Sequence, residues 1–445
     1  MALPIAVYEC RSSATAGNVN GGGFNSARGG TDYTLQDAAQ IHSTDGVSTA
    51  STNFTSVTGG FTDAMKGNFL HLISATGADE VVGWYEIVSV TDGNTLVLDR
   101  TSGTYTLADF YIGGAMSLNS ALDDAFFEIM IAGSTIYMKN GSFSLGESLV
   151  VLIDGTSAAP IVLEGYNSAR GDAPTGASRP TIACGANSMD FTGAADWLFR
   201  YLIITSTNAT AAIAPGAENH LLFIKATNTN ASSTGAAFGS SSSISDVRYD
   251  FCEAIDASGR GFEIGNDNNL HGCVATGCAI GVKVGGGDRN SINFCIFDGC
   301  AVAIDLSSAT SESIEIINCT LYGAETPAGT GIDMGATQTS VFINNIIYGF
   351  TTGITATSLV TQRFVANNNF YNNTTNRTNF TTGTNDIALD PGFTDGAGGN
   401  FAVGANMKAA GIPGVFPGAT STGYLDIGAV QRQEPTGSFA PTVME

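Results

Sequence analysis

Apolar and polar residues alternate in short stretches along most of the chain, and these stretches recur at a regular interval. VFINNIIYGFTTGIT (residues 341–355) is one copy, with IEIINCTLYGAETPAGTGID before it and FVANNNFYNNTTN after it. Alternation with a period of two is typical of a β-strand that buries one face. Each copy also has an Asn or a Cys at the same place, so the copies predict equivalent turns of one repeating structure.

Two columns of residues define the repeat. The first column holds six equivalent residues, separated by 21, 22, 24, 26 and 23 positions: Cys252, Cys273, Cys295, Cys319, Asn345 and Asn368. The second column holds apolar residues that each follow Gly or Ala: Phe262, Val282, Ile304, Ile332 and Ile354. A repeat of this length, rich in β-branched residues and turns, is typical of a β-solenoid. Leucine-rich repeats need a Leu/Asn frame that is missing here, and propeller blades need about 40 residues. We therefore predict an all-β protein in which residues 132–431 form a parallel β-helix.

The N-terminal part follows other patterns. Residues 1–50 are Gly-rich with little periodicity, which predicts an extended arm for assembly or anchoring. In 83–100, two alternating runs flank a turn at 92–94, and together with 68–75 they predict a small antiparallel β module over 51–116. In 117–131 one helical face holds apolar residues and predicts a short capping helix. These residues are Leu118, Leu122, Ala125, Phe126 and Ile129. Residues 432–445 remain as a C-terminal tail.

The composition argues against several classes of binding partner. The 445-residue chain has 17 Lys and Arg against 40 Asp and Glu, a net charge of −23. Nucleic acids and anionic membranes attract clustered positive charge, so neither is an expected partner. No apolar run reaches the length of a membrane span. The start, MALPIAVYECRSS, lacks the basic and apolar regions of a signal peptide, so we expect synthesis in a cytoplasm without export by that route.

The Cys and Asn column is predicted to face the interior. A metal or redox role for the thiols would call for His at ligand spacing, which is missing, so we interpret them as reduced core residues. Disulfides between rungs are the alternative. Cys278 and Cys300 begin another column with the same interpretation. Asn345 over Asn368 predicts an amide ladder at a strand corner, with substrate binding as the alternative.

The outward columns hold the candidates for chemistry. Glu263, Lys283, Asp305 and Asp333 share one position in four successive rungs. The Asp305–Asp333 pair is compatible with a glycosidase carboxylate pair, with a Ca²⁺ site or with a solvated face, and we favour the solvated face. No catalytic residue is assigned, and no cofactor is expected unless this pair binds Ca²⁺.

A second outward column holds aromatic residues. Tyr322, Tyr348 and Tyr371 occupy one rung position. They are candidates for stacking on a glycan, with outer-face strand residues as the favoured alternative.

Several motifs resemble the pectate-lyase-like superfamily of right-handed parallel β-helices. AGSTIYMKNGSFSL (132–145) and GTSAAPIVLEGY (155–166) are similar to its first rungs, and DPGFTDGAGGNFAV with GYLDIGAVQ (423–431) is similar to its closing segment. NGGGFNSARGGTDYTLQDAAQ with the 83–100 module resembles β-helix proteins of tailed bacteriophages. That resemblance implies a virion component, often trimeric. The catalytic motifs of the enzyme branches do not carry over, because His271-Gly272 has no RIK sequence after it and no paired Asp before it.

These observations favour a structural virion protein over an enzyme. We expect it on the virion surface, either decorating the capsid or forming a tail spike or fibre. Its expected partners are two further copies of itself, capsid or tail proteins, and host glycans. The short tail after residue 431 favours the capsid-surface role. The alternative is a polysaccharide depolymerase, a lyase or hydrolase acting on host surface glycans. A bacterial adhesin is a third candidate, but it needs an export signal that we do not find.

Overall fold

The computed structural model describes residues 5–14, 19–77, 79–118, 123–230, 235–240, 243–255, 258–286, 289–308, 313–335, 339–358, 363–412 and 425–431. The chain forms two compact units, residues 1–187 with 193–203 and residues 188–192 with 204–445. The protein is all-β with a parallel β-solenoid of about nine turns and a small antiparallel barrel, as the alternating pattern predicts. In the described residues no helix is long and apolar enough to cross a membrane.

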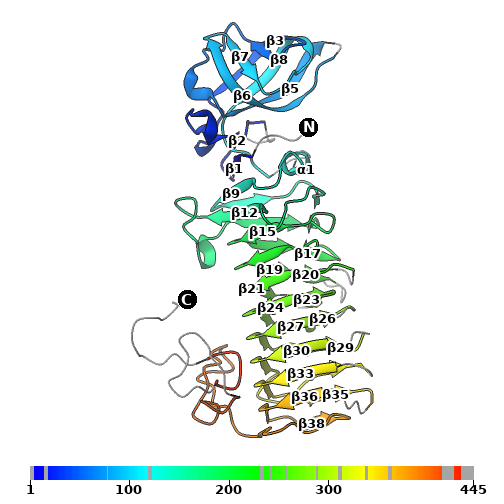
Figure 1. The fold of residues 1–445 in the computed structure, drawn as a ribbon. Coiled ribbons are helices and arrows are strands. Elements are labelled where there is room, and N and C mark those ends of the chain that lie inside the picture. Colours follow the sequence, from blue (N-terminus) through cyan, green and yellow to red (C-terminus); the bar gives the residue numbers. More distant parts are fainter. Residues whose placement is uncertain are drawn as a thin grey trace. The chain divides into compact units, whose positions relative to one another are not determined.

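The first unit contains a closed six-stranded barrel (Figure 1). Its strands follow the order β3–β4–β7–β6–β5–β8 around the barrel. They are β3 (Ile41–Thr49), β4 (Asn53–Thr55), β5 (Phe69–Gly77), β6 (Gly83–Asp92), β7 (Thr95–Leu98) and β8 (Thr104–Ile112), with a short 3-10 turn η3 (Asp63–Met65) before β5. Phe54, Leu70, Tyr85 and Phe110 fill the interior. The hairpin expected from residues 83–100 is the β6–β7 pair.

The structure corrects the prediction of an extended arm over residues 1–50. Strand β1 (Val7–Cys10) pairs in parallel with β9 (Thr135–Lys139), and β2 (Gly23–Phe24) pairs antiparallel with β1. Two 3-10 turns follow, η1 (Ser26–Arg28) and η2 (Tyr33–Leu35), and β3 belongs to the barrel. The four residues of β1 are too few to show a period, yet Tyr8 and Cys10 are fully buried. Residues 1–4 and 15–18 of the expected arm lie outside the described residues.

The rest of the first unit contains its first solenoid rungs. Helix α1 spans Asp123–Phe127, shorter than the predicted 117–131, and Leu122 lies outside the described residues. Strands β9, β12 (Ile161–Tyr166) and β15 (Trp197–Arg200) extend the sheet of β1, and β10 (Ser142–Ser144) pairs with β13 (Thr181–Gly185). Strand β11 (Leu149–Val150) and the turn η4 (Gly176–Ser178) complete this part.

The second unit is a parallel coil with three strands in each turn (Figure 1). Sheet A, as we name it, contains β18 (His220–Leu222), β21 (Arg248–Asp250), β24 (Asn269–His271), β27 (Asn290–Asn293), β30 (Ser313–Ile317), β33 (Thr339–Ile343) and β36 (Arg363–Ala366). Sheet B contains β19 (Lys225–Asn228), β22 (Glu253–Ile255), β25 (Val274–Thr276), β28 (Ile296–Asp298), β31 (Thr320–Tyr322), β34 (Ile346–Tyr348) and β37 (Asn369–Tyr371). Strand β16 (Ile203–Ser206) lies at the boundary of the two units.

Sheet C is the third sheet of the coil. It contains β14 (Met189–Asp190), β17 (Ala211–Ala214), β20 (Ala236–Gly239), β23 (Arg260–Ile264), β26 (Ile280–Val284), β29 (Val302–Leu306), β32 (Thr330–Met334), β35 (Thr352–Ala356) and β38 (Thr375–Thr378). The apolar column of the sequence runs in register through this sheet, from Phe262 to Ile354. Its members are buried, so the predicted repeat is the rung of the solenoid.

A closing segment, residues 390–412 and 425–431, packs against the outer face of sheet B. Phe401, Met407 and Ile427 of this segment share one buried cluster with Ile346 and Tyr348. An outward face of the solenoid is thereby covered by the end of the chain.

Candidate functional sites on the solenoid

The corner between sheets A and B has the same local structure in successive rungs. The residue that precedes each Cys or Asn of the interior column has a left-handed backbone, as at Phe251, Phe294, Asn318 and Asn344. Gly and Asn adopt this conformation most easily. The bend turns the chain from one sheet to the next and points the following side chain inward.

The thiols and amides of this column make one recurring hydrogen bond. Each donates to the backbone carbonyl that lies one rung earlier in sheet A. The acceptors are Leu221 for Cys252, Tyr249 for Cys273, Leu270 for Cys295, Ile292 for Cys319, Ile316 for Asn345 and Phe342 for Asn368. These six carbonyls belong to residues that stand in register across sheet A. The column braces the corner, and its members are buried.

All eight cysteines are buried, and none forms a disulfide. Burial raises the pKa of the Cys252, Cys273 and Cys295 thiols well above its usual value, because the thiolate would lose hydration. Among the described residues, no three His, Cys, Asp or Glu side chains are grouped so that they could hold a metal ion. The raised pKa values disfavour the reactive thiolate form and agree with the interpretation of these thiols as core residues.

The Asp305–Asp333 pair lies in register on β29 and β32, on the outer side of sheet C. Asp305 accepts from Lys283 Nζ at 2.8 Å through Oδ2, and from the Ser307 N–H at 2.9 Å and hydroxyl at 2.6 Å through Oδ1. Both of its oxygens are thus engaged by the protein, which disfavours the Ca²⁺ interpretation.

The two carboxyls are shifted in opposite directions. Burial opposes ionisation of Asp305, but the hydrogen bonds from Lys283 and Ser307 outweigh it and lower its pKa. Burial and the charge of Asp305 raise the pKa of Asp333. In hydrolases, two carboxyls with separated pKa values supply an acid and a base. Acid–base chemistry is therefore compatible with the Asp305–Asp333 pair, although the sequence analysis favoured a solvated face.

The tyrosine column, a candidate for glycan stacking, is largely covered by the closing segment. Tyr322 and Tyr348 stack at 5.1 Å between ring centroids, and both hydroxyls donate to Glu325. Phe393 and Phe401 of the closing segment pack on these rings, leaving Tyr322 4% and Tyr348 7% exposed. Only Tyr371 stays half-buried. The rings of Tyr322 and Tyr348 form an internal seam and are not accessible for stacking on a sugar.

A cluster that sequence reasoning missed lies on the outer side of sheet A. His220 Nε2 is 2.8 Å from Asp250 Oδ2, and Arg248 Nε is 2.6 Å from the same oxygen. The Asp250 side chain is 5% exposed, whereas His220 and Arg248 are 32% and 59% exposed. Burial opposes ionisation of Asp250, but the His220 hydrogen bond and the Arg248 charge lower its pKa overall. Its Oδ1 is buried and has no hydrogen-bond partner within the described residues.

This cluster has the parts of a proton-transfer site. A buried carboxylate that holds one imidazole nitrogen leaves the other nitrogen free to accept a proton. An exposed guanidinium binds carboxylates in a bidentate way. His271 follows Asp250 in register on the next rung, and the neighbouring Phe251 is 49% exposed. Proton abstraction next to a sugar carboxylate is the reaction class that fits these groups.

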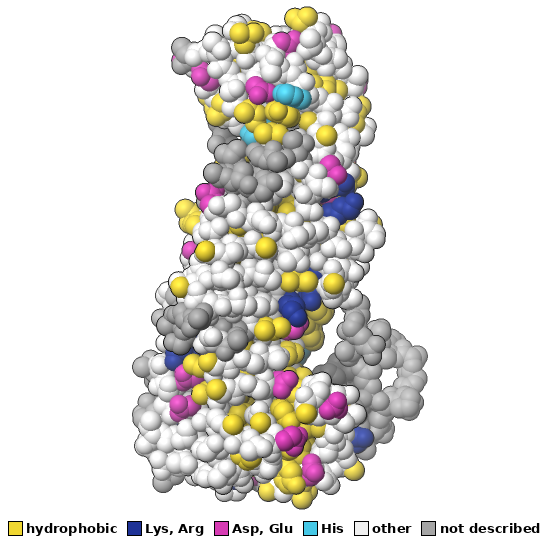
Figure 2. Space-filling model, turned by 180° about the vertical axis from the view of Figure 1, so that it is seen from behind, with side chains coloured by type: hydrophobic (Ala, Val, Ile, Leu, Met, Phe, Trp, Pro, Cys, Tyr) yellow, Lys and Arg dark blue, Asp and Glu magenta, His cyan; other side chains and the backbone are white. Residues whose placement is uncertain are grey.

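Charged side chains are sparse on the face that Figure 2 shows. Figure 2 shows Asp and Glu side chains spread among hydrophobic ones over the C-terminal rungs, with Lys and Arg in small separate groups.

No protein-family model and no curated protein sequence matches the chain. Several solved structures do resemble it. The pectate lyase Pel9A is 15% identical with a TM-score of 0.40, over 69% of this chain and 90% of its own. An alginate lyase from Paenibacillus sp. is 13% identical with a TM-score of 0.36, over 61% and 95%. The tailspike protein gp49 from Pseudomonas phage LKA1 is 14% identical with a TM-score of 0.27, over 80% and 64%. At these identities the likeness concerns the fold alone.

Proposed function

We propose that the chain is a structural protein of a bacteriophage particle. It is exposed on the particle surface, assembles as a trimer and is anchored through its N-terminal region, and its solenoid faces the host. The observation that carries this proposal is the way in which the N-terminal barrel joins the first rungs within the first unit. An anchoring module must transmit force to the part that it holds, so it needs a rigid connection.

A shared aromatic core provides one part of this connection. Tyr8 of β1 packs edge-to-face on Phe69 of the barrel strand β5 at 5.6 Å, and on Phe126 of α1 at 5.8 Å. Trp84 of β6 lies 6.3 Å from Phe126. Buried aromatic pairs of this kind contribute about 0.5–1.5 kcal/mol beyond the area that they bury.

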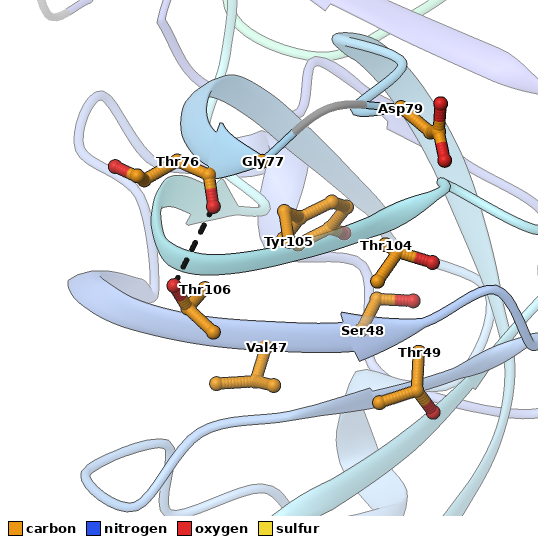
Figure 3. A pocket seen from close by; sticks show the side chains of 9 residues that line it. All are labelled: Val47, Ser48, Thr49, Thr76, Gly77, Asp79, Thr104, Tyr105 and Thr106. Carbon is orange, nitrogen blue, oxygen red and sulfur yellow. Dashed lines mark hydrogen bonds between the residues drawn. The ribbon is translucent and has the colours of Figure 1, made fainter.

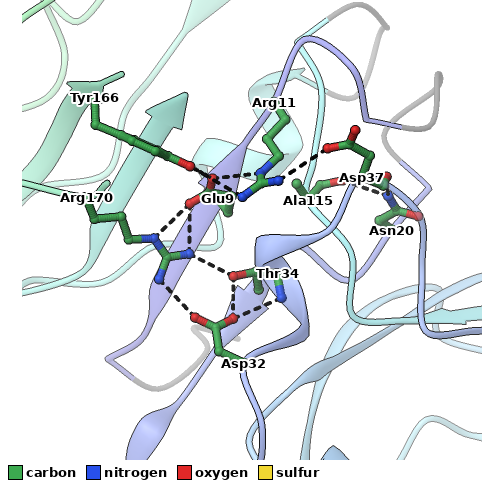
Figure 4. A network of polar contacts seen from close by, with 9 residues as sticks. All are labelled: Glu9, Arg11, Asn20, Asp32, Thr34, Asp37, Ala115, Tyr166 and Arg170. Carbon is green, nitrogen blue, oxygen red and sulfur yellow. Dashed lines mark hydrogen bonds and ion pairs between the residues drawn. The ribbon is translucent and has the colours of Figure 1, made fainter. Parts of the chain in front are cut away.

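A buried ion network provides the other part (Figure 4). The carboxylate of Glu9, which is fully buried, accepts from Arg11 at 3.0 Å, from Arg170 at 2.8 Å and from the Tyr166 hydroxyl. Arg170 also binds Asp32 at 2.9 Å, next to η2. The network ties β1, β12 and the segment before the barrel into one body, as an anchored base requires.

The test is the position of the chain on the particle of the phage that encodes it. Purified particles are labelled with antibodies against the full chain, before and after disruption, and are examined by cryo-electron microscopy. We expect outward labelling on intact particles and density for a trimer. Absence of the chain from purified particles, or labelling only after disruption, would overturn the proposal.

A depolymerase is the second candidate, and the His220–Asp250–Arg248 cluster favours it. In a lyase acting on a uronate glycan, the free nitrogen of His220 takes the proton next to the carboxylate, and Arg248 binds that carboxylate. The glycosidic C–O bond then breaks as a C=C bond forms, and the leaving oxygen takes up a proton.

The full chain is incubated with host capsular polysaccharide and lipopolysaccharide, and released unsaturated uronates and reducing ends are measured. A lyase gives unsaturated products that His220→Ala and Arg248→Ala abolish and that the barrel variant His42→Ala retains. Release of reducing ends without unsaturation, lost in Asp305→Asn, would assign hydrolysis to the sheet C pair instead. No product from either glycan would remove this candidate.

A further inference from the structure

The N-terminal barrel contains a hollow of about 340 Å³ (Figure 3). It is lined by Val47–Thr49 of β3, by Thr76 and Gly77 of β5, by residues 104–106 of β8, and by Asp79. Strand β8 pairs with β3 on one side and with β5 on the other, so one short stretch of β8 forms the middle of the lining.

The strands around the hollow are irregular on both sides. The β3–β8 register shifts between Ser43 and Gly46 and again between Gly46 and Ser48. The β5–β8 register shifts between Leu72 and Ser74 and again before Thr76. Such bulges bend a strand, increase its twist and redirect side chains, and they are frequent beside binding sites.

Six of the nine residues of the lining carry a hydroxyl group. Ser48 pairs with Tyr105 across the strands, Thr49 pairs with Thr104, and Asp79 supplies the one carboxylate of the lining. The Tyr105 hydroxyl is held by Ser102 Oγ at 2.6 Å, and burial raises its pKa to about 12, so the ring is a fixed and neutral wall.

One of these hydroxyls lacks a well-formed hydrogen bond. Ser48 is 2% exposed and lies beside the Tyr105 hydroxyl, which Ser102 already engages. Its Oγ has no partner at hydrogen-bond geometry within the described part of the chain. A buried hydroxyl is normally satisfied by protein, water or ligand. The Ser48 Oγ is itself buried, so the hydroxyls that a ligand in the hollow can reach are those of the exposed Thr49, Thr76, Thr104 and Thr106.

The lining residues and the volume of the hollow favour one chemical class of ligand. Hydroxyl groups both donate and accept hydrogen bonds, as sugar hydroxyls do, and a carboxylate accepts from two neighbouring hydroxyls. Ligand pockets typically measure about 300–1,000 Å³, so this hollow suits one sugar ring better than a longer segment. We propose that the barrel hollow binds a single neutral saccharide unit, such as the terminal residue of a glycan. Thr49 and Thr104 bond to ring hydroxyls, and Asp79 accepts from a vicinal pair.

This site goes beyond the proposed function, and it holds whether the solenoid is structural or catalytic. The experiment uses the full chain and four probes, the methyl glycosides of glucose, galactose, mannose and N-acetylglucosamine. Saturation-transfer NMR detects which of them bind, and competition measures their affinities.

Two variants locate the binding. Thr104→Trp fills the hollow from an exposed position, and Thr91→Trp places the same side chain on an exposed position of β6 outside it. We expect at least one glycoside to bind the unmodified chain and Thr91→Trp, and none to bind Thr104→Trp. Thr49→Val should weaken binding by about three- to tenfold, as expected for one lost hydrogen bond.

A substitution in the solenoid tests whether glycoside binding in the barrel is independent of the candidate depolymerase site. His220→Ala should leave glycoside binding unchanged, because His220 belongs to sheet A. The proposal fails if none of the four glycosides binds, or if Thr104→Trp binds them as well as Thr91→Trp does. Circular dichroism of both Trp variants confirms that the barrel is folded when the comparison is made.

Discussion

The side-chain amide of Asn345 donates to Oδ1 of Asn368 at 3.0 Å in the interior of the solenoid. The same Oδ1 accepts from the backbone N–H of Asn345 at 3.0 Å, and Oδ1 of Asn345 accepts from the N–H of Cys319 at 2.8 Å. Each side-chain amide therefore forms hydrogen bonds with backbone groups of neighbouring rungs as well as with the neighbouring side-chain amide. A thiol at the same position donates to a carbonyl but has no oxygen to accept.

Replacing Asn345 by Ala should destabilise the solenoid. The change leaves the Ile316 carbonyl and the Cys319 N–H without their side-chain partners, and unmet buried groups cost about 1–3 kcal/mol each. We expect Asn345→Ala to lower the free energy of unfolding by about 2–4 kcal/mol. Urea unfolding followed by circular dichroism measures this difference.

Asn345→Cys is the matched variant. A thiol at this corner donates to the carbonyl one rung earlier, as Cys319 does to Ile292 at 3.3 Å. Asn345→Cys should recover part of the lost free energy of unfolding, because the Ile316 carbonyl regains a hydrogen-bond donor. Asn269→Ala, on the exposed side of β24, serves as the control and should have little effect. Equal stability of the Ala and Cys variants would contradict the shared role of the column.

The buried thiols should be unreactive in the folded protein. All eight cysteines are buried, and burial raises the pKa of Cys184 to about 12, so the thiolate that reacts is almost absent at neutral pH. We expect Ellman's reagent to detect nearly no thiol in the native chain and all eight after denaturation. Fast reaction of even one native thiol would show that the column opens in solution.

Alternation and repeat length predicted the solenoid well, because both are local properties of the sequence. The Asn345 and Cys319 positions align from the amino-acid pattern alone, since each rung repeats the same corner. The barrel strand β3 and the strand β1 could not be predicted from the pattern. Their apolar runs are short and lie in a Gly-rich segment, and they are buried only by pairing with strands that are distant in the sequence.

The sites were harder to predict for the same reason. His220 and Asp250 are 30 residues apart, and neither belongs to a column with a repeated residue type. Their contact depends on the rung length, which the loops between the strands determine. Tyr322 and Tyr348 were placed correctly in one column, but their cover by Phe393 and Phe401 is a long-range contact that periodicity does not encode.

The Asp305–Asp333 pair should respond to pH in opposite ways. The folded-state pKa of Asp305 is lowered, so its stabilising contribution is present above its unfolded pKa and is lost as the pH falls through the folded value. The folded-state pKa of Asp333 is raised, so its contribution is most favourable below its unfolded pKa and is lost as the pH rises through the folded value.

Two variants measure these contributions. At neutral pH we expect Asp333→Asn to raise the free energy of unfolding by less than about 1 kcal/mol, because Asp333 is partly exposed. We expect Asp305→Asn to lower it by about 1–3 kcal/mol, because Asp305 is buried and its hydrogen bonds with Lys283 and Ser307 are weakened. The Asp333→Asn difference should shrink as the pH falls through the raised folded pKa of Asp333 towards about 3.8, whereas the Asp305→Asn difference should shrink only as the pH falls below about 3.8. Urea unfolding at several pH values measures the free energy of unfolding of each variant as a function of pH. A stabilisation by Asp333→Asn that is larger in acid than at neutral pH would contradict the assignment.

Glu9 should be the most sensitive residue of the barrel connection. Its replacement by Ala leaves Arg11 and Arg170 beside a cavity without their common carboxylate, and removal of one partner from a buried ion network costs about 3–5 kcal/mol. We expect Glu9→Ala to lower the stability of the first unit by this amount. Hydrogen exchange, measured by mass spectrometry, should show faster exchange in β1 and β12 than in the unmodified chain.

The control for this prediction is Glu80→Ala, which removes a carboxylate from an exposed position of the same unit. Its exchange pattern should match that of the unmodified chain. Arg170→Ala should give an intermediate effect, because Arg11 and Tyr166 still bind Glu9 when Arg170 is gone. If Glu9→Ala left exchange in β1 unchanged, the network would not hold the barrel to the rungs, and the aromatic contacts of Tyr8 would have to provide the connection alone.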